Sequence, residues 1–161
     1  MRVRTLFIAL SAVVVVVLAA WILATGSVLD ASDIWVKVSE NNATIFLNLH
    51  NKGLLPDCAT AVEVIGEGSV GTISLRAGLY KTTMDNNLIK VSKICVNPLS
   101  TVKLQETNVE GYRIIVLGDV EKIKVYHIYI TFESGEILHL HAVPGIQHQR
   151  IAMCSIDVEN V

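Results

Sequence analysis

Three histidines near the end of the chain have a spacing that suits a metal site. His127, His139 and His141 lie in two alternating segments that flank Glu133-Ser134-Gly135. A three-residue loop ending in glycine is typical of a hairpin, and here it would pair His127 with His141. His139 would share their face, because side chains two residues apart on a strand point the same way. Three imidazoles gathered in this manner suit Zn(II) or Cu(II).

The same hairpin also has an ordinary explanation. Its other face is apolar and should point to the core; it carries Ile128, Ile130, Phe132, Leu138 and Leu140. The histidine face would then be a solvated strand face, which needs polar residues of some kind. No acidic residue that would orient the imidazoles is evident beside them in the sequence. The tail offers additional ligands, namely His148, Met153 and Cys154.

The cysteines permit a disulfide if the domain is exported. Cys58 and Cys95 each stand at the end of an expected strand, so a bond between them would close a long loop. Two alternatives stay open at this point. Cys154 could pair with either one, or the thiols could be reduced and buried as small apolar side chains.

Sequence motifs give no support for an enzyme. The chain has no Gly-rich phosphate loop, no GxSxG and no HExxH. Gly66-Glu67-Gly68 indicates a turn and not a dinucleotide-binding motif, because no helical pattern follows it. We therefore expect a binding or structural protein.

Short segments with period-two alternation continue from residue 34 to residue 143. The expected strands are residues 34–38, 43–50, 59–65, 72–75, 88–94, 102–105, 112–117, 122–132 and 136–143. Turn residues separate them, and no segment after residue 27 has a helical stripe. This pattern predicts an all-β, antiparallel sandwich. Its expected core includes Trp35, Phe46, Ile114, Val116, Ile130 and Leu138.

The start of the chain has a different composition. Residues 5–24 carry no charge and follow Arg2 and Arg4, which is the pattern of a secretory signal or a membrane anchor. The run is just long enough to span a bilayer, but the small residues Ala24-Thr25-Gly26 would also allow cleavage before Ser27. Both alternatives place the rest of the chain outside the cytoplasm.

These patterns divide the chain into three parts. Residues 1–26 are the signal peptide or anchor, residues 27–143 the β domain, and residues 144–161 a tail or edge strand. Of the 13 Lys and Arg residues two precede the apolar run, which leaves 11 against 15 Asp and Glu. These charges are scattered without a basic stripe, so we expect no nucleic acid as a partner.

The middle of the chain resembles a known family. Residues 80–91 (YKTTMDNNLIKV), 101–104 and 111–118 are similar to signature segments of the PCuAC-type periplasmic copper chaperones. The Trp35 strand and the Phe132-Glu133-Ser134-Gly135 hairpin also fall in family order. The resemblance implies a cupredoxin-like β-sandwich that binds copper, chiefly Cu(I), and passes it to the copper centre of an oxidase.

The copper ligands of that family are missing from this chain. Its His, Met, His and Met positions fall, with spacing retained, on Tyr80, Val91, Arg113 and Ile115. None of the four is a soft donor, and Arg113 brings a fixed positive charge. The resemblance thus implies that the fold is kept and the usual copper site vacated. We expect the four side chains to lie within reach of one another.

Two functions are consistent with this sequence. The first is an extracytoplasmic, copper-chaperone-like binding domain for copper or zinc, with an oxidase or a copper-transport protein as partner. The second is a structural or protein-interaction module of the envelope that has discarded the metal. The membrane itself is a partner only if the N-terminal segment stays uncleaved.

Overall fold

The computed structural model describes residues 12–20, 28–69, 71–85, 87–105 and 111–145 of the 161-residue chain. Residues 12–20 form a helix with exposed side chains, inside the apolar segment expected to direct export. Within these ranges no helix is both long and apolar enough to cross a membrane. The expected tail or edge strand at residues 146–161 lies outside the described residues.

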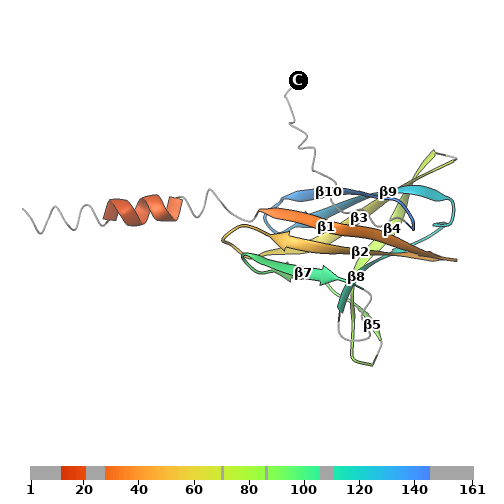
Figure 1. The fold of residues 1–161 in the computed structure, drawn as a ribbon, viewed down its shortest axis with the longest axis horizontal. Helices are drawn as coiled ribbons and strands as arrows, with labels where there is room; N and C mark the ends of the chain where they lie inside the picture. Colours follow the sequence, from red (N-terminus) through yellow and green to blue (C-terminus); the bar gives the residue numbers. More distant parts are fainter. Residues whose placement is uncertain (1–11, 21–27, 70, 86, 106–110, 146–161) are drawn as a thin grey trace, which may run out of the picture.

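The described residues form ten β-strands (Figure 1). They are β1 (Leu29–Ser39), β2 (Asn42–Asn51), β3 (Asp57–Gly68), β4 (Gly71–Thr82), β5 (Leu88–Lys90), β6 (Ile94–Val96), β7 (Ser100–Leu104), β8 (Gly111–Leu117), β9 (Ile123–Phe132) and β10 (Ile137–Ala142). The strands pair antiparallel in the order β1-β2-β8-β4-β3-β9-β10, with β7 on β2, β5 on β4 and β6 on β3. The all-β, antiparallel class predicted from the alternation is confirmed.

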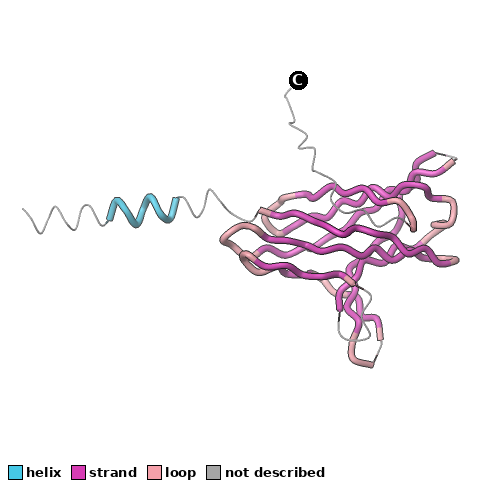
Figure 2. The backbone as a smooth tube through the Cα atoms, in the orientation of Figure 1, coloured by secondary structure: helices cyan, strands magenta, loops and turns pink. Residues whose placement is uncertain are grey.

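Strand β4 joins the two layers of the sandwich. Its residues up to Leu75 pair with β3, whereas those from Arg76 onward pair with β8. One layer therefore contains β1, β2, β7 and β8, and the other contains β3, β6, β9 and β10. Figure 2 shows the two layers lying face to face. Across the remaining gap, a bridge between Val36 and Pro144 connects the β1 edge with the segment after β10.

Side chains that alternate inward from both layers form one core. Five of the six residues expected there are no more than 1% exposed: Phe46, Ile114, Val116, Ile130 and Leu138. The last four belong to this core, whereas Phe46 is buried on the opposite face of β2 from Ile45 and Leu47. Each can contribute about 1.5–3 kcal/mol relative to an exposed side chain. This core fixes which face of every strand points outward.

The sixth expected core residue, Trp35, was assigned to the wrong face. Leu29 and Ala31 point inward at odd positions, but Ile34 and Val36 point inward at even ones. An irregularity in the β1–β2 register between Ser32 and Trp35 causes this switch. The half-buried Trp35 ring consequently stacks on Phe46, with 4.4 Å between ring centroids.

Two further strand predictions were wrong in extent. Residues 88–94 form not one strand but β5 and β6, because the chain crosses here from one layer to the other: β5 pairs with β4, and β6 with β3. The expected strand 72–75 is the start of the longer β4. Gly66-Glu67-Gly68, expected as a turn, is the last part of β3.

A disulfide links β6 to its neighbour β3 in the same layer. Cys58 of β3 and Cys95 of β6 are directly opposite each other, with Cα atoms 3.9 Å apart, and their sulfurs are bonded. The bond closes a loop spanning 37 residues that contains β4 and β5. The disulfide therefore restricts the conformations that the unfolded chain can adopt over a large part of the domain.

Replacing both Cys58 and Cys95 with Ser should lower the free energy of unfolding by about 3–4 kcal/mol, because the unfolded chain regains the entropy of the open loop. Urea unfolding followed by circular dichroism measures this change. Cys154→Ser, outside the pair, is the control and should keep the wild-type midpoint. A double variant as stable as wild type would contradict the prediction.

Candidate metal centre

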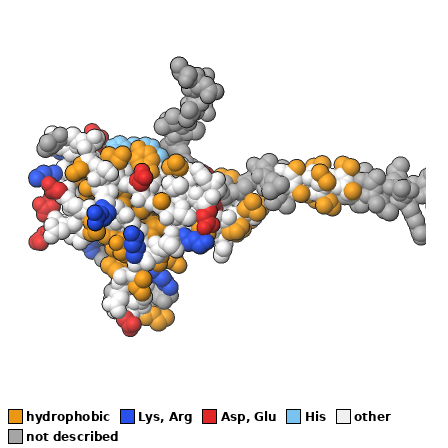
Figure 3. Space-filling model, turned by 180° about the vertical axis from the view of Figure 1, so that it is seen from behind, with side chains coloured by type: hydrophobic (Ala, Val, Ile, Leu, Met, Phe, Trp, Pro, Cys, Tyr) orange, Lys and Arg blue, Asp and Glu red, His pale blue; other side chains and the backbone are white. Residues whose placement is uncertain are grey.

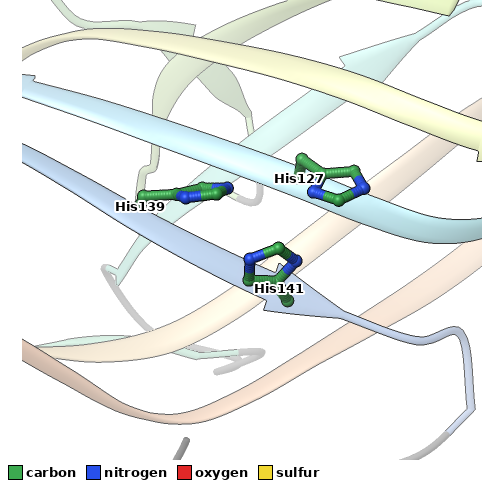
Figure 4. Close-up of side chains that lie close together, drawn as sticks. All are labelled: His127, His139 and His141. Carbon is green, nitrogen blue, oxygen red and sulfur yellow. The ribbon is translucent and has the colours of Figure 1, made fainter. Parts of the chain in front are cut away.

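The three histidines of the last hairpin lie together on its outer face. Thr131 pairs with Ile137 and His127 with His141, so the register predicted from the three-residue loop is confirmed. His139 stands opposite Tyr129, two residues before His141. The inward positions Ile128, Ile130 and Leu140 are buried, which leaves the imidazoles on the other side. Figure 4 shows the three rings close together over β9 and β10.

The distances between the rings suit a shared ion. One nitrogen from each imidazole can be chosen so that all three lie within 4.8 Å of one another. Among the described residues this is the one such group of three or more His, Cys, Asp or Glu side chains. A tetrahedral ion with bonds of about 2.0–2.1 Å would hold its nitrogens about 3.4 Å apart. To share an ion, the nitrogens would therefore have to move closer together through side-chain rotation.

The rings are also in contact with one another. The centroids of His127 and His141 are 4.6 Å apart, and those of His139 and His141 are 4.4 Å apart. Tyr129 stacks on His139 with 4.3 Å between centroids and 8° between planes, which limits the orientation of that ring. The buried Nε2 of His139 has no hydrogen-bond partner within the described part of the chain. Coordination to an ion could occupy the lone pair of a ring nitrogen instead.

The protonation state of the cluster favours metal binding. Burial lowers the pKa of His139 below its ordinary value of 6.5, and the neighbouring His141 and His127 lower it further. Burial, followed by the effect of His127, lowers the pKa of His141 in the same direction. Only a neutral imidazole offers a lone pair to a metal, so both rings are ready to bind at neutral pH.

Sequence reasoning missed a carboxylate beside the cluster. Glu67 of β3 places its Oε2 atom 3.3 Å from Nε2 of His127. Strand β3 pairs with β9 so that Ile65 is opposite His127, and Glu67 is two residues further along β3 on the same face. No local sequence pattern indicates that β3 and β9 pair. The sequence pattern also predicts a turn at Gly66-Glu67-Gly68, whereas Glu67 lies on a strand.

The additional ligands expected from the tail, His148, Met153 and Cys154, lie outside the described residues, so their participation stays a prediction. His50 is on β2, where Nε2 contacts Ser32 Oγ and Nδ1 contacts Thr101 Oγ1, both at 2.8 Å. Both of its ring nitrogens are thus occupied. Figure 3 shows histidine side chains as a pale-blue patch on the surface. The positively and negatively charged side chains are scattered over the same view.

The positions that correspond to the usual copper ligands of the family lie in the other layer, and three of the four share a face. Tyr80 of β4 is directly opposite Arg113 of β8, and Ile115 follows Arg113 two residues along. Val91 instead donates its N–H to the carbonyl oxygen of Leu79 at 2.9 Å and packs against the core. The expected cluster is therefore formed by Tyr80, Arg113 and Ile115 without the Val91 side chain.

The surroundings of Tyr80 are cationic. Lys90 of β5 stands opposite Tyr80 on one side, and Arg113 on the other. The buried Nε of Arg113 has no hydrogen-bond partner within the described ranges. None of the four family positions carries an imidazole or a thioether. The positive charges of Lys90 and Arg113 beside Tyr80 would also repel a cation.

Comparison with solved structures identifies the fold. The apo PCuAC domain from PmoF1 matches with a TM-score of 0.55 and 16% identity, covering 74% of this chain and 98% of that one. The apo PmoF2 PCuAC domain gives 0.52 and 18%, covering 74% and 94%. The copper-bound PCuAC domain from PmoF2 gives 0.50 and 16%, covering 74% and 97%.

These likenesses show that the chain has the cupredoxin-like fold of PCuAC domains, as its signature-like segments had indicated. At this level of identity the similarity concerns the fold. No protein-family model matches the chain, and no curated protein matches its sequence.

The lowered pKa values of His139 and His141 predict a pH dependence of the metal-free protein. Below about pH 6.5, His139 and His141 become protonated in the unfolded chain but stay neutral in the folded protein, because their pKa values are lower there. The free energy of unfolding should therefore fall as the pH drops from 6.5 toward the folded pKa values. Above 6.5 these groups should have no effect. Denaturant unfolding in EDTA across this range measures the slope, and His139→Gln/His141→Gln should reduce it. An unchanged slope in that variant would contradict the prediction.

Proposed function

We propose that this protein is an extracytoplasmic metal-handling domain on the PCuAC fold that binds its ion at His127, His139 and His141. The observation that carries this proposal is the approach of three imidazole nitrogens to within 4.8 Å of one another. A site of three imidazoles with an open position suits Zn(II) or Cu(II). The role is that of a binding module, without catalysis.

The location outside the cytoplasm is part of the proposal. Arg2 and Arg4 before the uncharged residues 5–24 favour export, with the domain either anchored or released. A disulfide between Cys58 and Cys95 fits an oxidising compartment. An oxidase or a copper-transport protein would be the acceptor of the ion.

One observation favours a second function. Lys90 and Arg113 on either side of Tyr80 make the place of the usual copper ligands unfavourable for a cation. A domain that had discarded metal binding altogether would serve as an envelope interaction module.

Metal analysis of the exported domain after separate loading with Cu(I), Cu(II) and Zn(II), followed by desalting, distinguishes the two functions. One equivalent of a divalent ion supports the first, and no retained ion supports the second.

Replacing His139 and His141 with Ala should abolish the uptake of Zn(II) and Cu(II), because a single imidazole remains. The free energy of unfolding of the metal-free variant should stay within about 0.5 kcal/mol of wild type above pH 6.5, as for surface changes. Equilibrium dialysis measures the uptake. His50→Ala is the matched control, since it removes an imidazole from another strand face. Wild-type uptake by the double variant would rule the site out.

Restoring donors at the family positions should create Cu(I) binding. In a His139→Ala/His141→Ala background, Y80H/R113H/I115M should be sufficient, because these side chains share one face. Adding V91M should contribute little, since Val91 packs against the core. Competition with a Cu(I)-specific chelator measures the affinity. A gain that appears only with V91M would show that residue 91 reaches the site after all.

A further inference from the structure

In the described part of the chain, one carboxylate contacts the histidine cluster: that of Glu67, which lies against His127. Glu67 stands near the end of β3, and its side chain is 56% exposed, against 23% for His127. Its Oε2 atom approaches Nε2 of His127 at 3.3 Å. Because β3 is hydrogen-bonded to β9 on the side away from β10, this contact does not occupy the space between the three rings.

The contact has a consequence for the ring of His127. An ionised carboxylate can only accept hydrogen bonds, so the Nε2 atom that faces it must donate. In a neutral imidazole the other nitrogen, Nδ1, then carries the lone pair. Nδ1 is therefore the ligand atom that His127 would offer, and the carboxylate holds the ring in this tautomer.

The charge of Glu67 also affects which ions bind. A carboxylate hydrogen-bonded to a ligating imidazole makes that ligand more basic. Its attraction for a bound ion is proportional to the charge of the ion, so a divalent cation gains twice as much as Cu(I). Imidazole nitrogens without sulfur donors likewise suit Zn(II) and Cu(II) better than Cu(I).

We infer, on the basis of the proposed metal site, that Glu67 is its positioning residue: it fixes His127 for ligation through Nδ1 and biases the site toward divalent cations. Among the described residues, the three histidines provide the donor atoms. Glu67 determines the orientation of one of them and supplies the negative charge nearby.

The test compares Glu67→Ala and Glu67→Gln with the matched control Glu63→Ala. Glu63 is on the same strand and face, four residues away and opposite Tyr129, so its removal changes the net charge equally. Zn(II) affinity is measured by competition with a chromophoric chelator, and Cu(I) affinity with a Cu(I)-specific one. Nitrogen-15 NMR of the imidazole rings at pH 7.5 reports the tautomer of His127.

We expect Glu67→Ala to weaken Zn(II) binding about 10-fold, the lower end of the usual effect because Glu67 is largely exposed. Glu67→Gln can still accept the hydrogen bond and should lose less. The loss in Cu(I) affinity should be smaller than that for Zn(II), and Glu63→Ala should match wild type. In the metal-free protein His127 should be protonated at Nε2, and Glu67→Ala should shift this equilibrium toward Nδ1.

Two results would overturn the inference while leaving the proposed function intact. One is a Glu67→Ala variant that binds Zn(II) as tightly as wild type, and the other is a Cu(I) loss as large as the Zn(II) loss. A wild-type protein that retains no Zn(II) or Cu(II) would overturn the proposed function and this inference with it. Circular dichroism of each variant confirms that it is folded.

Discussion

The pairing of β9 with β10 is the constraint on which the proposed site depends. Phe132 donates its N–H to the carbonyl oxygen of Glu136 at 2.9 Å, and Gly135 closes the loop with a φ of 87°, which glycine adopts at little cost. This turn sets His127 opposite His141. A shift of one residue would send the imidazoles to the core side, where Ile130 and Leu138 are now buried. The core therefore holds the histidines in register.

The candidate site and the usual copper positions of the fold belong to different layers. The former is on β9 and β10, whereas Tyr80, Arg113 and Ile115 are on β4 and β8. Under the proposed function, the same fold would bind its ion in a different layer from the one that holds the family positions. Imidazoles in place of thioethers would favour a divalent ion over Cu(I).

Sequence reasoning succeeded where the signal was local. Alternation and the three-residue loop were enough to predict the fold class, the β9–β10 register and the grouping of the histidines. It failed where the signal was not local: the bulge that turns Trp35 outward, the crossing that separates β5 from β6, and the β3–β9 pairing that brings Glu67 to His127. The crossing and the β3–β9 pairing depend on contacts between segments far apart in the chain, and the bulge interrupts the alternation of β1 at a place that periodicity does not mark.

X-ray absorption spectroscopy of the domain loaded with one equivalent of Zn(II) tests the central claim most directly. Tetrahedral zinc bound to the cluster should show nitrogen or oxygen neighbours at about 2.0–2.1 Å, with the multiple scattering of three imidazoles. Glu67, acting through His127, should not appear as a direct ligand. A first shell with fewer than three imidazoles would contradict the account.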